Sequence, residues 1–83
     1  MPVAELTMLK KLRIEIEHPT KITQEMMARD SRITLITYRK VEGGGRTTYG
    51  TARSILNTLN AYRKIGKLSI IPESDIPQIF NLE

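Results

Sequence analysis

The chain contains no cysteine and a single histidine. Without cysteine neither a disulfide framework nor a thiolate metal site can form, so the fold must be stabilised by packing. His18 has no second histidine or cysteine to share a metal with, and an exposed residue near the end of a helix is its ordinary explanation. The composition therefore predicts no bound metal and no cofactor.

Signatures of catalysis and of membrane insertion are also missing. The chain has no cysteine nucleophile, no HExxH motif and no serine in a nucleophile-elbow context. No apolar run approaches the length needed to span a bilayer, and residues 1–21 lack the basic-then-apolar order of a secretory signal. We expect a protein of the cytoplasm that is not an enzyme.

The charge is unevenly distributed over the 83 residues, a length that suits one small domain with one core. Residues 1–28 balance four basic against four acidic groups. Residues 29–67 carry nine basic and two acidic groups, and residues 68–83 carry three acidic groups alone. This concentration of positive charge within a net charge of +4 indicates a polyanionic partner such as nucleic acid.

The stretch from Ile22 to Gly45 has the pattern of two short helices separated by a turn. Residues 24–29 are good helix formers, and residues 30–33 break the helical period. Thr34 can cap a second helix, which the glycines at 43–45 would end.

One side of this second helix is expected to be buried and the other exposed. Tyr38 and Val41 are three residues apart and would face inward. The side chains expected to point outward are those of Leu35, Ile36, Arg39 and Lys40. A short helix with a basic outer face suits a groove of DNA.

At these residues the chain resembles the cro/C1-type helix-turn-helix family, also called the Xre or lambda-repressor-like family. The match follows the family pattern without a gap over about a quarter of the chain. Its positions are Thr23, Gln24, Ala28, Thr34, Thr37, Lys40, Val41, Glu42 and Gly44. Arg32 departs from the pattern because the family usually has glycine there, and a residue with a Cβ enters a left-handed conformation only at a cost. Ser31, Tyr38 and Gly43 also differ from the usual residues.

The resemblance implies an all-α, lambda-repressor-like helix-turn-helix domain of four to five short helices with an apolar C-terminal tail. Residues 1–67 would form the DNA-binding domain, and residues 68–83 would pack on its core or at a dimer interface. The implied function is sequence-specific binding of double-stranded DNA by a homodimeric transcription regulator, in particular a repressor.

The DNA contacts fall into two groups. The resemblance places Leu35, Ile36 and Lys40 on the groove face with Arg39 beside them, and the aliphatic side chains could contact only thymine methyl groups or exclude water. Phosphates could be held by Gln24 and the backbone N–H groups at the start of the helix over residues 24–29, by Thr37, and by the loop residues Arg46, Thr47 and Thr48. The predicted DNA-binding residues are Gln24, Thr34, Leu35, Ile36, Thr37, Arg39, Lys40, Arg46, Thr47 and Thr48.

Two flanking segments show helical periodicity. In residues 5–17, apolar residues recur at three- and four-residue steps before Pro19. A further helix is expected to start at Tyr49 or Thr51, with apolar residues at i, i+3, i+4 and i+7. Gly66 is placed to end this helix. The basic residues of its last turn are explained by the helix dipole, and they are Arg63, Lys64 and Lys67.

Other interpretations remain open at the level of sequence. Residues 33–38 are nearly all β-branched or aromatic, so residues 33–49 could form a hairpin closed by the glycine cluster. The matching positions on both sides favour the helix. The alternative functions are a protein-interaction module, such as an antitoxin that binds a partner through its C-terminal tail, and a nucleic-acid binder that contains a β-hairpin.

Overall fold

A computed structural model describes residues 7–83. Within this range the chain is mostly helical, as predicted. Its elements in order are α1 (Met8–Glu15), α2 (Gln24–Asp30), α3 (Leu35–Glu42), β1 (Arg46–Thr47), α4 (Tyr49–Ile65), the 3-10 turn η1 (Glu73–Asp75), α5 (Ile76–Ile79) and β2 (Asn81–Leu82). No helix among these residues has the length and apolar character needed to cross a membrane.

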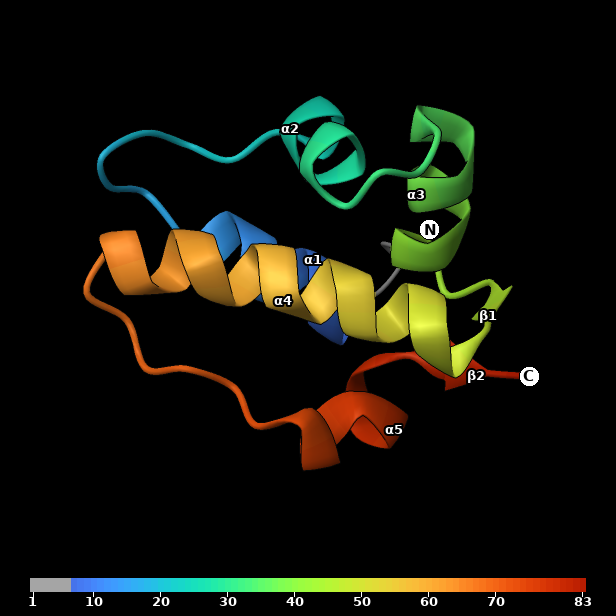
Figure 1. Ribbon diagram of the computed structural model, residues 1–83. Coiled ribbons are helices and arrows are strands. Elements are labelled where there is room, and N and C mark those ends of the chain that lie inside the picture. Colours follow the sequence, from blue (N-terminus) through green and yellow to red (C-terminus); the bar gives the residue numbers. More distant parts are fainter. Residues whose placement is uncertain (1–6) are drawn as a thin grey trace, which may run out of the picture.

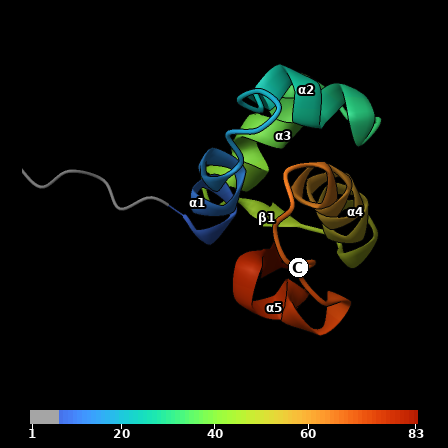
Figure 2. The ribbon, with the colours of Figure 1, turned by 90° about the vertical axis from the view of Figure 1, so that its left-hand side faces the viewer.

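The long helix α4 lies at the centre of the domain. In Figure 1 it runs across the middle of the view, with α2 and α3 on one side and α5 on the other. Figure 2 looks nearly along α4 and shows α1 on a third side of it. The core forms where these helices face one another, from Leu9, Ile16, Ile22, Met27, Ala28, Tyr38, Val41, Ala52, Ile55, Leu56, Leu59, Ile76 and Phe80.

Four of the helices begin at a threonine. In α1 to α4 the Oγ1 of the capping residue accepts a hydrogen bond from the backbone N–H three residues further on. This bond satisfies one of the N–H groups that a helix leaves free at its start. The caps are Thr7, Thr23, Thr34 and Thr48, so the predicted capping by Thr34 is confirmed.

The first helix is shorter than the periodicity predicted. It begins at Met8 after the cap and ends at Glu15, and the predicted start at residues 5 and 6 lies outside the described residues. Ile16 is extended and 1% exposed. Because an extended residue can still point into the core, Ile16 is buried without the last helical turn that its spacing suggested.

The ends of three helices share one geometry. Arg32, Gly44 and Lys67 follow α2, α3 and α4 with φ values of 59°, 97° and 61°. At each end, the N–H of the left-handed residue and the next N–H donate to carbonyls of the last helical turn, which is the Schellman motif. Gly66 ends α4 as predicted but is not left-handed. A Cβ on it would lie 2.8 Å from the carbonyl oxygen of His18, so close backbone approach is what requires glycine there.

The helical interpretation of residues 35–42 is confirmed. The alternative prediction, a hairpin over residues 33–49, is wrong. Tyr38 is 0% and Val41 6% exposed, in agreement with their predicted inward positions. Residues 46 and 47 do form a strand, but they pair in parallel with β2, with Arg46 opposite Asn81 and Thr47 opposite Leu82. The partner strand therefore comes from the end of the chain, which a local hairpin pattern cannot reveal.

The C-terminal segment packs on the chain's own helices. Ile76 and Phe80 are buried in the common core. The side-chain amide of Asn60 on α4 both donates to and accepts from the backbone of Ile71, at 2.9 Å in each direction. Arg63 also binds this segment, through a 2.7 Å hydrogen bond from its Nε to the carbonyl oxygen of Ser69.

Arg63 corrects the dipole explanation of the basic residues at the end of α4. Its side chain is 8% exposed, and its Nη1 pairs with the Glu15 carboxylate. Arg63 therefore ties α1 and the C-terminal segment to α4. Lys64 and Lys67 are exposed.

Candidate nucleic-acid interface

The outer side of α3 carries the exposed residues expected of a binding surface. Ile36 is 81% exposed, the highest value among the large exposed hydrophobic residues described, and Thr37, Arg39 and Lys40 are also exposed. Leu35 corrects the prediction in part, because it is only partly exposed and packs against the core. It stands three residues before Tyr38 and therefore lies near the buried side of the helix.

The turn between α2 and α3 is anchored on α4. The Oγ of Ser31, which is 6% exposed, donates to the Oγ1 of Thr58 at 3.0 Å. Thr58 in turn donates to the carbonyl oxygen of Ser54 at 3.1 Å. These bonds satisfy the buried Ser31 hydroxyl and hold the end of α2, just before the turn to α3, against the central helix.

A buried ion pair holds the end of α3. Glu42 is 2% exposed, and its carboxylate accepts from the Arg13 Nε at 2.8 Å and from the Arg13 Nη2 at 2.9 Å. The Arg13 Nη1 donates to the carbonyl oxygen of Ile22 at 2.8 Å. The hydroxyl of Thr7 donates to the backbone carbonyl oxygen of Glu42 at 2.6 Å. One arginine therefore joins α1, the segment before α2 and the last turn of α3.

The electrostatics of this cluster favour a charged Glu42. Burial on its own raises the pKa of the Glu42 carboxyl, but the hydrogen bonds from Arg13 and Gln24 outweigh burial, and the pKa lies below its usual value. Burial raises the pKa of the adjacent Tyr38 phenol, and the negative charge of Glu42 acts in the same direction. The Tyr38 hydroxyl is buried and has no hydrogen-bond partner in the described part of the chain.

Gln24 is positioned differently from the prediction that it contacts a phosphate. Its side-chain Nε2 donates to the Glu42 Oε1 at 3.0 Å, and its Oε1 accepts from the Arg39 Nε at 3.3 Å. Both ends of the amide are thus engaged within the protein. Arg39 leans toward α2, where its Nη2 also lies 3.7 Å from the Glu25 Oε1.

Of the residues after α3 that were predicted to contact phosphate, Arg46 and Thr48 are exposed and Thr47 is buried. Arg46 is exposed, as a phosphate contact requires. Thr47 is 5% exposed, because it belongs to β1. Its carbonyl oxygen accepts a hydrogen bond from the N–H of Glu83 at 3.0 Å. The Thr48 hydroxyl caps α4, as the Thr34 hydroxyl caps α3. The Thr47 side chain is therefore not available for the predicted contact.

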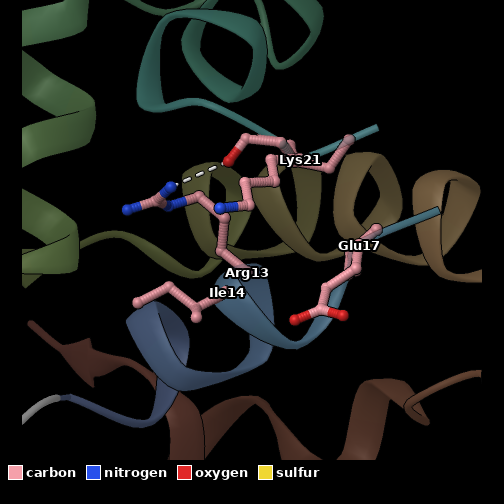
Figure 3. A pocket seen from close by; sticks show the side chains of 6 residues that line it. Arg13, Ile14, Glu17 and Lys21 are labelled. Atoms are coloured by element: carbon pink, nitrogen blue, oxygen red, sulfur yellow. Dashed lines mark hydrogen bonds between the residues drawn. The ribbon is translucent and has the colours of Figure 1, made fainter. Parts of the chain in front are cut away.

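An open cavity of about 250 Å³ lies at the end of α1, away from the outer side of α3. Figure 3 shows the Arg13 guanidinium donating to the backbone of Ile22, and the Glu17 carboxylate lying apart from that guanidinium. The lining mixes aliphatic side chains with charges of both signs. It presents no converging set of polar groups.

The buried cluster was missed by the sequence predictions. Its signal in the sequence was a charged residue, Arg13, at a position shared with the apolar side of the first helix. Glu42 matched the family pattern but had no assigned role. No protein-family model, curated protein or solved structure matches the chain. A functional assignment therefore rests on the residues themselves and on the geometry of α3 and its neighbours.

Proposed function

We propose that this protein binds double-stranded DNA in a sequence-specific way and regulates transcription, as a repressor that blocks access to a promoter. The observation that carries the proposal is the two-sided character of α3. Its inner side is held by Tyr38, Val41 and Glu42, while Ile36 and Lys40 are exposed. A short helix fixed on one side and exposed on the other can enter a major groove without rearrangement of the core.

The chemistry of the exposed side suits base contacts. The Lys40 ammonium can donate to the O6 and N7 acceptors of guanine, and Ile36 can contact the methyl group of thymine. Arg46 is exposed in β1, which follows α3, and can bind a phosphate, which adds affinity without sequence preference. The arrangement of α2, the turn and α3 supports the helix-turn-helix class that the sequence resembles.

We further propose that two copies bind together, because a single short helix contacts few base pairs and paired half-sites add both energy and symmetry. If each copy neutralises about four phosphates, the logarithm of the affinity should fall with the logarithm of the salt concentration at a slope of about −7. A purely hydrophobic association would show little dependence on salt.

The alternative functions receive less support. Ile76 and Phe80 of the C-terminal segment are buried in the chain's own core, so they are not offered to a protein partner. A nucleic-acid binder built on a hairpin at residues 33–49 does not agree with the helical α3.

The test compares variants of three exposed basic residues by fluorescence anisotropy, on a duplex selected from a random pool and on random duplex. Lys40→Ala should weaken binding to the selected duplex by about 1 to 3 kcal/mol and relax its base preference. Arg46→Ala should weaken binding to all duplexes alike. Lys64→Ala is the matched control, since it removes an exposed lysine from the end of α4 far from α3 (Figure 1).

Absence of binding to any duplex at low salt would refute the proposed function. Equal and small losses for Lys40→Ala on selected and random DNA would refute the assignment of α3 to the groove.

A further inference from the structure

Gln24 connects a buried charge to an exposed one. It is the first residue of α2 and lies between the Glu42 carboxylate, which is 2% exposed, and the Arg39 side chain, which is 55% exposed. A carboxylate only accepts hydrogen bonds, so the amide must turn its NH₂ group toward Glu42. The amide oxygen then faces Arg39, whose Nε donates to it at 3.3 Å. The buried carboxylate thereby determines the group that Arg39 meets.

This contact limits the positions that Arg39 can take. Its Nε is held by an amide on α2, and its Nη2 lies 3.7 Å from the Glu25 Oε1. A guanidinium binds anions through paired N–H groups, which makes it suited to a phosphate. The Arg39 and Glu25 side chains are 55% and 62% exposed. An exposed ion pair of this kind is weak in water and can be exchanged for another anion.

We propose that Gln24 is a positioning residue that holds Arg39 for a DNA phosphate next to the start of α2, and that this phosphate displaces Glu25. The inference rests on the proposed function and deepens it. Arg39 then contributes to affinity and salt dependence and not to base preference, which differs from its predicted place beside the base contacts. Gln24 acts through Arg39 and does not contact the DNA itself.

The experiment measures binding of a labelled random-sequence duplex by anisotropy, between about 50 and about 200 mM salt. Arg39→Ala should lower the affinity about two- to fivefold and make the salt slope shallower by about 1. Gln24→Met keeps the side-chain volume and removes the hydrogen bonds to Glu42 and Arg39. It should cause most of the loss of duplex affinity that Arg39→Ala causes. In the Arg39→Ala background, Gln24→Met should have no further effect on binding.

Glu25→Gln should act in the opposite direction. It removes the counter-ion that a phosphate must displace, so binding should become about two- to fivefold tighter. Glu17→Gln is the matched control, because it removes the same charge from an exposed residue that does not contact Arg39. The difference between these two variants separates local displacement from the change in net charge.

Gln24→Met also removes a hydrogen bond from Glu42, so urea unfolding of each variant must show that it is folded during the titrations. If Gln24 has a purely structural role, Gln24→Met should lower duplex affinity equally in the unaltered protein and in the Arg39→Ala variant. That result overturns the inference. Equal binding by Glu25→Gln and Glu17→Gln overturns it as well. If the unaltered protein binds no duplex, the proposed function fails and this inference with it, whereas binding without coupling refutes this inference alone.

Discussion

Replacing Glu42 by glutamine should be among the most destabilising conservative changes in this chain. The carboxylate is 2% exposed and accepts three side-chain hydrogen bonds, two from Arg13 and one from Gln24. An amide of the same shape can accept on one side only, and its NH₂ group would face the donors of Arg13. The Arg13 charge, 13% exposed, would then lie in the core region without a counter-ion.

The expected loss is about 3 to 5 kcal/mol, the range for removal of one partner from a buried ion pair. A domain of this size has a total stability of only about 4 to 12 kcal/mol, so the variant should be marginally folded at room temperature. Urea unfolding followed by circular dichroism measures the difference. Glu25→Gln is the control, because it removes an exposed carboxylate and should change stability by less than about 1 kcal/mol.

The loss should also depend on pH in a defined direction. The pKa of Glu42 in the folded protein lies below its ordinary value of 4.5. The contribution of Glu42 to stability is therefore complete above pH 4.5 and disappears as the pH falls through the folded pKa. The difference between the unaltered protein and Glu42→Gln should therefore be constant near neutral pH and shrink below pH 4.5.

Two outcomes would refute this reasoning. One is a loss below about 1 kcal/mol for Glu42→Gln, the value expected of an exposed pair. The other is a difference that does not change on acidification. If Glu42→Gln is unfolded, the double variant Arg13→Met/Glu42→Leu provides the check. Replacing both charges by apolar side chains should restore much of the stability that Glu42→Gln loses.

Three further predictions concern α3 and its surroundings. Arg32→Gly should stabilise the protein by up to about 1 kcal/mol in urea unfolding, because glycine adopts the observed φ of 59° without a Cβ penalty; Arg32→Val should destabilise it. Tyr38→Phe should raise stability by about 1 kcal/mol, since it removes a buried hydroxyl without a partner, and a loss would mean that this hydroxyl is satisfied. Ile36→Ala should change stability by less than about 0.5 kcal/mol, because the side chain is 81% exposed. On a selected duplex, replacing the contacted thymine by uracil should weaken binding by the unaltered protein about fourfold, the effect of one methyl group. The same replacement should leave binding by the Ile36→Ala variant unchanged.

Local patterns in the sequence were sufficient to predict most of the helices. The Thr34 cap and the glycines after α3 are short-range signals, because capping bonds and Schellman motifs connect residues only a few positions apart. The same holds for the inward positions of Tyr38 and Val41, which are set by the helical period. The predicted outward position of Lys40 agrees with its exposure for the same reason.

The burial of Thr47 and the role of Arg63 depended on partners distant in sequence. Thr47 was predicted to be available for contact, but it is buried because β1 pairs with residues at the end of the chain. Arg63 was assigned to the helix dipole, yet its partners are Glu15 and Ser69. No pattern within one element indicates which distant carboxylate or carbonyl group an arginine will meet.

By itself, the sequence determined the start, the end and the buried side of α3, because these depend on capping and on the helical repeat. Only the tertiary structure decided how its polar side chains are used. It brings Glu42 against Arg13, and it turns Arg39 toward α2 through Gln24. The physical reason is that hydrogen bonds and ion pairs require contact distances of about 3 Å, and the packing of α1, α2 and α3 sets those distances.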